Sequence, residues 1–132
     1  MQTNQQKFAT TAFNQVVKEV KGKGNTYCQK YGSMSHKLPL LIRTAGLAQA
    51  LAFVRAKKEE AYNDLLNHLA TNVAWPGVAT GEQLAAKSRS EHLDGYILLT
   101  RRVSAALIWY KRFAESELGI TANQDILEGG GE

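Results

Sequence analysis

The side chains best suited to acid, base or metal chemistry are scattered along this sequence. None of the three histidines, His36, His68 and His92, is followed by a second ligand three or four residues later, as helical metal sites require. Asp64 and His68 could pair at this spacing, but a surface hydrogen bond is commoner there than an acid/base couple. A Cys28 nucleophile would need a nearby histidine, and a lone packed cysteine is commoner. We therefore expect no catalytic residues, no metal and no cofactor, and a protein that is not an enzyme.

Length, cysteine content and the N-terminal segment indicate the domain number and the compartment. With 132 residues it is most simply one domain, and one cysteine rules out an internal disulfide. The polar start, residues 1–6, has neither the basic nor the apolar region of a secretory signal. We expect a cytoplasmic protein.

Charge is distributed unevenly along the chain. Up to Lys58 there are ten lysines and arginines against one acid, whereas from Glu59 onward there are six against eleven acids. Such segregation indicates an acidic partner, and nucleic acid is the usual one. A solvated basic surface without a partner is the alternative.

Hydrophobic periodicity predicts an all-α fold and no strand. The most apolar segment, about residues 39–56, has apolar side chains on nearly every side, so we predict that it forms a central helix starting near Pro39. We predict a single compact bundle of five to six helices around it. The other expected helices span about residues 4–21, a short segment from 27 toward 38, about 60–74, a short helix after Thr80, and about 92–118.

Two of these helices begin with a capping box, Thr3 with Gln6 and Thr80 with Gln83. We predict a helical domain over residues 1–118. Residues 119–132 are acidic and Gly-rich, and we expect them to be a mobile tail.

A second apolar row lies on the outer side of the last helix. It consists of Leu98, Ala105 and Trp109 and is flanked by arginines, a composition typical of binding hot spots. Leu98 and Trp109 are therefore candidates for a partner interface. The alternative is that this helix is buried on both sides.

Four segments in this order and spacing resemble one known family. They are Lys30-Tyr31-Gly32-Ser33, Leu38-Pro39-Leu40-Leu41-Ile42, Gly46-Leu47-Ala48-Gln49-Ala50-Leu51-Ala52-Phe53 and Trp109-Tyr110-Lys111-Arg112-Phe113-Ala114-Glu115. Together they are similar to the small all-helical subunit of the type III-B CRISPR (Cmr) effector complex. The resemblance covers most of the chain to about Leu118.

This resemblance implies a non-catalytic subunit that serves antiviral defence. Several copies would stack along the backbone of repeat-type subunits and line the groove that holds crRNA and target RNA, with the large subunit as a further neighbour. A guide of variable sequence has to be held through its phosphates. The candidate RNA contacts are Lys18, Lys21, Lys23, Lys30, Lys37 and Arg43, with Arg101, Arg102 and Arg112 as a second group.

One alternative function remains from the sequence. A free-standing helical regulator would read DNA through a recognition helix, but no helix-turn-helix pattern with polar readout residues is evident.

Overall fold

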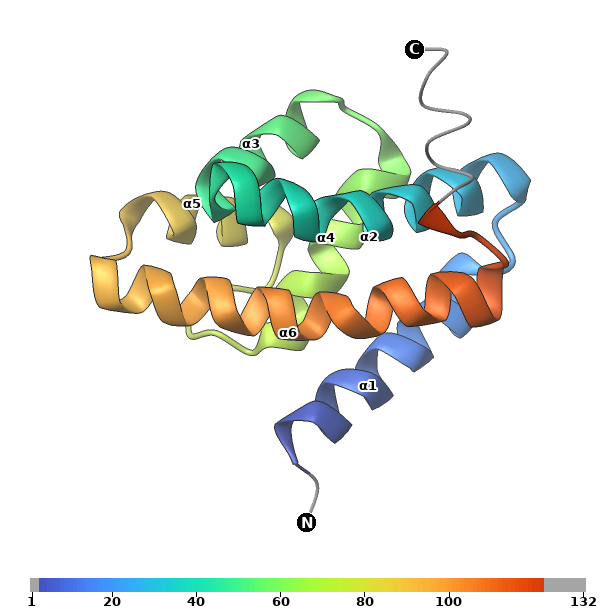
Figure 1. The fold of residues 1–132 in the computed structure, drawn as a ribbon, viewed down its shortest axis with the longest axis horizontal. Helices are drawn as coiled ribbons and strands as arrows, with labels where there is room; N and C mark the ends of the chain where they lie inside the picture. Colours follow the sequence, from blue (N-terminus) through green and yellow to red (C-terminus); the bar gives the residue numbers. More distant parts are fainter. Residues whose placement is uncertain (1–2, 123–132) are drawn as a thin grey trace.

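A computed structural model, described here for residues 3–122, consists of six α-helices and one π-helical turn. Helices α2 and α6 lie side by side and antiparallel, α1, α3 and α4 pack against one or both of them, and α5 packs on α3 and α4 (Figure 1). The elements are α1 (Asn4–Gln15), η1 (Val16–Val20), α2 (Asn25–Ala45), α3 (Leu47–Ala56), α4 (Glu60–Val73), α5 (Gly81–Ser90) and α6 (Leu93–Leu118). The all-α prediction is confirmed.

The first helix forms as its sequence indicates. Thr3 accepts a hydrogen bond from the backbone N–H of Gln6, and the Gln6 side chain accepts one from the N–H of Thr3. These two bonds satisfy donors that a helix start leaves without partners. The helix then widens into the π-helical turn η1, which ends just before Lys21.

The predicted central helix is wrong. Pro39 lies inside α2, and the chain breaks instead at Gly46, where φ is +87°. A proline removes only one backbone donor, and the packing of Leu38 and Ile42 on both sides of it keeps α2 continuous. The apolar residues therefore belong to two helices, α2 and α3, which meet at an angle.

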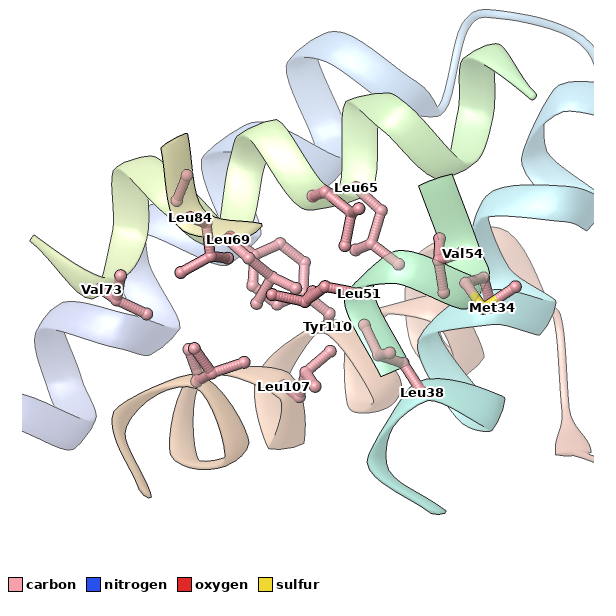
Figure 2. Close-up of a cluster of buried hydrophobic side chains, with 14 of the residues drawn as sticks. Met34, Leu38, Leu51, Val54, Leu65, Leu69, Val73, Leu84, Leu107 and Tyr110 are labelled. Atoms are coloured by element: carbon pink, nitrogen blue, oxygen red, sulfur yellow. The ribbon is translucent and has the colours of Figure 1, made fainter. Parts of the chain in front are cut away.

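The hydrophobic core is shared among several helices. Figure 2 shows side chains from α2, α3, α4, α5 and α6 converging: Met34, Leu38, Leu51, Val54, Leu65, Leu69, Val73, Leu84, Leu107 and Tyr110. The helix that contacts all five others is α4, not the segment of residues 39–56. The apolar surface of residues 39–56 is instead divided between core contacts and exposed positions such as Leu40 and Phe53.

The remaining boundaries follow local signals. Lys58, with φ of +54°, separates α3 from α4. Helix α4 ends where Ala74 adopts the left-handed conformation before Trp75 and Pro76. Thr80 caps α5 by accepting the N–H of Gln83.

The end of the helical domain lies beyond Leu118. Ile120 is buried against Gly32 of α2, and its carbonyl lies 2.8 Å from Nε2 of His36. Ile120, a residue of the predicted tail, therefore packs against the helical domain. Residues 123–132, which carry most of the predicted tail, lie outside the described residues.

No helix within residues 3–122 combines the length and the apolar character needed to cross a membrane.

Candidate functional site

Three of the predicted RNA contacts lie together where η1 meets α2. Lys18, Lys21 and Lys23 are exposed on η1 and on the loop that follows it. Lys21 forms an ion pair with Glu117 at 3.7 Å, and Lys23 forms one with Asp64 at 3.5 Å. Both contacts are long and their lysines are exposed, although the carboxylates are partly buried, so the pairs contribute little to stability and the lysines can turn to another anion. We refer to these three residues as the lysine cluster.

Lys30 and Lys37 differ from the lysine cluster because both are partly buried. The Lys30 ammonium lies 2.7 Å from the Glu59 carboxylate and bridges α2 to the start of α4. Glu59, Asp64 and Glu117 all belong to the acidic half of the sequence. Charges that are segregated along the chain are therefore paired by the fold.

Arg43, Arg101 and Arg112 are exposed on α2 and α6. None of them forms an ion pair with a carboxylate within residues 3–122. The Arg112 guanidinium lies over the Trp109 ring, 5.4 Å from its centroid. These three cations are available to an external partner.

Arg102 has a structural role. Its Nε and Nη2 donate to the carbonyl of Val73 at 3.0 and 2.6 Å, and its guanidinium lies 5.6 Å from the centroid of the Phe8 ring. The arginine satisfies a carbonyl at the C-terminus of α4, where a cation is favoured. A phosphate contact would require it to give up these bonds, so we do not retain Arg102 as an RNA contact.

The predicted partner residues Leu98 and Trp109 have different surroundings. Leu98 is 52% exposed and lines a hollow of about 400 Å³ with Ala74, Trp75, Pro76 and Arg102. Trp109 is partly buried: its Nε1 donates to Oε1 of Gln5 at 2.9 Å, and its ring stacks on Phe113. About half of Leu98 is available to a partner, whereas Trp109 also ties α6 to α1.

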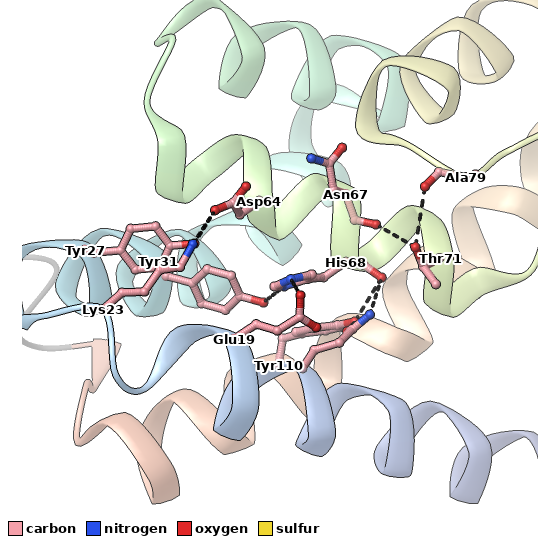
Figure 3. Close-up of polar contacts among 11 residues, drawn as sticks. Glu19, Lys23, Tyr27, Tyr31, Asp64, Asn67, His68, Thr71, Ala79 and Tyr110 are labelled. Atoms are coloured by element: carbon pink, nitrogen blue, oxygen red, sulfur yellow. Dashed lines mark hydrogen bonds and ion pairs between the residues drawn. The ribbon is translucent and has the colours of Figure 1, made fainter.

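A polar cluster between η1, α2 and α4 was not predicted from the sequence (Figure 3). Tyr27 donates to the Asp64 carboxylate, and the Tyr31 hydroxyl lies 2.7 Å from Nδ1 of His68. Asp64 and His68 therefore each bond a tyrosine and do not form the pair that their spacing suggested. Tyr27 and Tyr31 of α2 are spaced like core residues, so the sequence gives no indication that their hydroxyl groups form hydrogen bonds.

Burial sets the protonation states in this cluster. It raises the pKa of Tyr31 well above its usual value, so this hydroxyl stays protonated and donates to His68. Burial also lowers the pKa of His68, an effect that the Glu19 carboxylate 3.6 Å away partly opposes. The neutral imidazole thus accepts at Nδ1 and directs Nε2–H toward Glu19. These bonds hold the helices together, and the groups satisfy one another.

The residues considered for metal or nucleophilic chemistry remain apart. Within the described residues, no three histidine, cysteine or carboxylate side chains are grouped as metal ligands. Cys28 is buried, and its Sγ lies 3.3 Å from the carbonyl of Val20.

Comparisons of the sequence and of the structure with known proteins identify the same family. Residues 4–117 match the family model described as "CRISPR-associated protein (Cas_Cmr5)". The chain is 40% identical over 116 residues to the CRISPR system Cmr subunit Cmr5 of Thermus thermophilus, covering 88% of this chain and 96% of that protein. The crystal structure of a CRISPR-associated Cmr5 family protein from the same organism superposes with a TM-score of 0.78, covering 89% of this chain and 98% of that one at 40% identity.

Proposed function

The chain belongs to the Cmr5 family of CRISPR-associated proteins, as its sequence motifs predicted, and from this premise we propose that it is a non-catalytic structural subunit of an RNA-guided Cmr effector complex. The observation that carries the proposal is the family match over residues 4–117, which spans all six helices. Antiviral defence would be the role of the assembly. Other Cmr subunits, crRNA and target RNA would be its partners.

In this assembly several copies would stack along the backbone subunits. Head-to-tail stacking needs two different surfaces on each copy. The row that includes Leu98 and Trp109 supplies one of them, because the apolar hollow beside Leu98 can receive a side chain from a neighbour. The opposite surface of a copy, or a backbone subunit, would supply that side chain.

The lysine cluster is our proposed RNA contact. Its two ion pairs are long and their lysines are exposed, so RNA phosphates can replace Glu117 and Asp64 at small cost. Lysines on a loop contact the backbone and do not read base edges. We expect weak, sequence-independent binding of single-stranded RNA that falls steeply as salt increases.

Filter binding with the isolated protein tests the RNA contact. Single-stranded RNAs of unrelated sequence should bind with similar affinity over a salt series. A strong preference for one duplex DNA sequence would instead indicate a DNA-binding regulator. Reconstitution with the other Cmr subunits and a guide RNA tests the structural role, and failure of the wild-type chain to join the complex would contradict it.

A further inference from the structure

Besides Leu98, four large apolar side chains are exposed on α2 and α6. They are Leu40 (52% exposed), Leu93 (71%), Ile97 (41%) and Ile108 (44%). Only three other large apolar side chains in the described part of the chain are exposed to a similar degree. Leaving these groups in water is unfavourable, and their clustering is typical of an interaction surface.

The packing of α2 against α6 places them on one face. A Cβ at Gly32 would touch Ile120, just beyond the end of α6, and one at Gly46 would lie 3.1 Å from the Tyr96 hydroxyl near its start. These two contacts fix the antiparallel alignment that Figure 1 shows, with α4 behind both helices. Leu40 therefore lies level with the middle of α6 and close to the position of Ile108. We call the solvent side of these two helices the α2/α6 face.

Helical spacing defines the rest of this face. On α6, Leu93, Ile97, Arg101, Ser104 and Ile108 follow one another at intervals of three or four residues, so they share one side. All five are at least partly exposed. The row is largely apolar, with an arginine near its centre.

Cations alone carry the charge in the centre of the α2/α6 face. Arg43 on α2 and Arg101 and Arg112 on α6 are exposed among the apolar groups. Helix α2 contains no acid, and α6 contains none between Asp94 and Glu115. A partner that covers this face has to bring apolar groups for its centre and carboxylates for the arginines.

We propose that the α2/α6 face binds another protein subunit through a surface with an apolar centre and an acidic rim. The inference rests on the proposed function, because it assumes that the chain works inside an assembly. It assigns Arg43, Arg101 and Arg112 to a protein interface, whereas the sequence had suggested RNA. Arginine is enriched and lysine depleted in protein interfaces, which separates this face from the lysine cluster.

A second copy of the chain fits this face poorly. The exposed acids Glu19, Glu60 and Glu82 lie on η1, α4 and α5, none of which exposes a large apolar side chain, and Asp94 and Glu115 lie near the two ends of α6 itself. Two copies meeting through the α2/α6 face would bring arginines against arginines. RNA also fits poorly, because phosphates gain nothing from exposed isoleucine and leucine.

Reconstitution of the complex with surface variants tests the inference. The double variant Ile97→Ser/Ile108→Ser removes the apolar centre, and Phe53→Ser on α3, 46% exposed in the native chain, is the matched control. We expect the double variant to join the complex at least about tenfold less tightly than the wild type. Phe53→Ser should join normally, and all three proteins should bind single-stranded RNA with equal affinity.

Arg101→Glu is a second variant that leaves the apolar groups intact and poses little risk to folding. It should also weaken incorporation, and more strongly at low salt, because an acidic partner would then face a carboxylate. Circular dichroism checks that each variant is folded before it is mixed with the other subunits.

The possible results separate the two proposals. If the wild type does not join the complex, the proposed function fails. If it joins and both variants join equally well, the α2/α6 inference is overturned. Loss of RNA affinity in Ile97→Ser/Ile108→Ser would identify the face as an RNA surface. Self-association that this variant abolishes would identify a second copy, and tighter incorporation after removal of residues 123–132 would identify the chain's own C-terminus. Each of these three results also overturns the inference.

Discussion

Replacing Gly46 by alanine distinguishes two descriptions of the most apolar part of the chain. If one helix ran through this position, alanine would stabilise it by about 1 kcal/mol, because glycine is a poor helix former. The structure instead places Gly46 at the break between α2 and α3, with φ of +87° and ψ of +159°. The two descriptions predict changes of opposite sign.

The backbone at Gly46 determines the magnitude. This region of φ and ψ is almost restricted to glycine, and another residue there costs of order 1–3 kcal/mol. The new Cβ would also lie 3.1 Å from the Tyr96 hydroxyl, which accepts the N–H of Ala48 at the start of α3. The lower entropy of the unfolded alanine variant offsets roughly 0.4–1 kcal/mol of this cost. We expect a net loss of about 2 kcal/mol and a fall in Tm of about 6–10 °C.

Thermal and urea unfolding followed by circular dichroism measures the change. Gly22→Ala is the matched control, because nothing lies within 4 Å of a Cβ at that residue and its φ is not positive. It should change stability by less than about 0.5 kcal/mol. Repeating Gly46→Ala in a Tyr96→Phe background separates the steric contact from the backbone cost. A Gly46→Ala protein as stable as the wild type would refute the break at this residue.

Three further results follow from the described contacts. Replacing Lys18, Lys21 and Lys23 together by glutamine should lower the slope of log affinity against log salt for single-stranded RNA by about 2, at about 0.7 for each lost phosphate contact. Trp109→Ala should keep the helical fold, since the ring is only partly buried, and lower Tm by a few degrees while weakening assembly. His68 has a lowered pKa in the folded state, so the unfolded chain binds more protons as pH falls through about 6.5, and the free energy of unfolding should fall there. His68→Gln should flatten this pH dependence.

Each of these results has its own contradicting outcome. A control triple variant, Lys57→Gln/Lys58→Gln/Arg89→Gln, removes the same charge from other exposed positions. If it lowers the slope of log RNA affinity against log salt as much as the cluster variant does, the lysine cluster is not the RNA contact. A loss in Trp109→Ala above about 3 kcal/mol, the range for a fully buried tryptophan, would place the ring in the core. Identical pH profiles for the wild type and His68→Gln would mean that folding does not lower the pKa of this imidazole.

Local signals in the sequence were sufficient for much of the fold. The capping box at Thr3 and the cap that Thr80 provides each act within one helical turn, although the Gln83 side chain accepts from Ala79 and so leaves the second box incomplete. Helix boundaries of this kind can be predicted because the residues that identify a cap or a stop in the sequence are the same residues that form it. The helices that they bound are present as predicted.

Features that depend on distant contacts were not predictable. At Pro39 the sequence signal for a helix start competes with the burial of Leu38 and Ile42, and the tertiary contacts prevail. Ile120 is a single apolar residue in a polar stretch, and only the missing side chain of Gly32 makes room for it. The tyrosine bonds to Asp64 and His68 join residues that are 37 positions apart.

The charge pattern shows why a candidate site needs the fold as well as the composition. Along the sequence the first half is basic and the second acidic, yet Lys21, Lys23 and Lys30 lie against acids of the other half. Pairing within the chain reduces the positive potential that these lysines present to a partner. Arg43 and Arg101 form no ion pair in the described part of the chain, so their charges remain uncompensated. The carboxylates of a protein partner would therefore meet unpaired arginines on the α2/α6 face, where apolar side chains are exposed as well. RNA reaches the lysine cluster by displacing weak ion pairs, so salt should affect RNA binding and subunit assembly to different degrees.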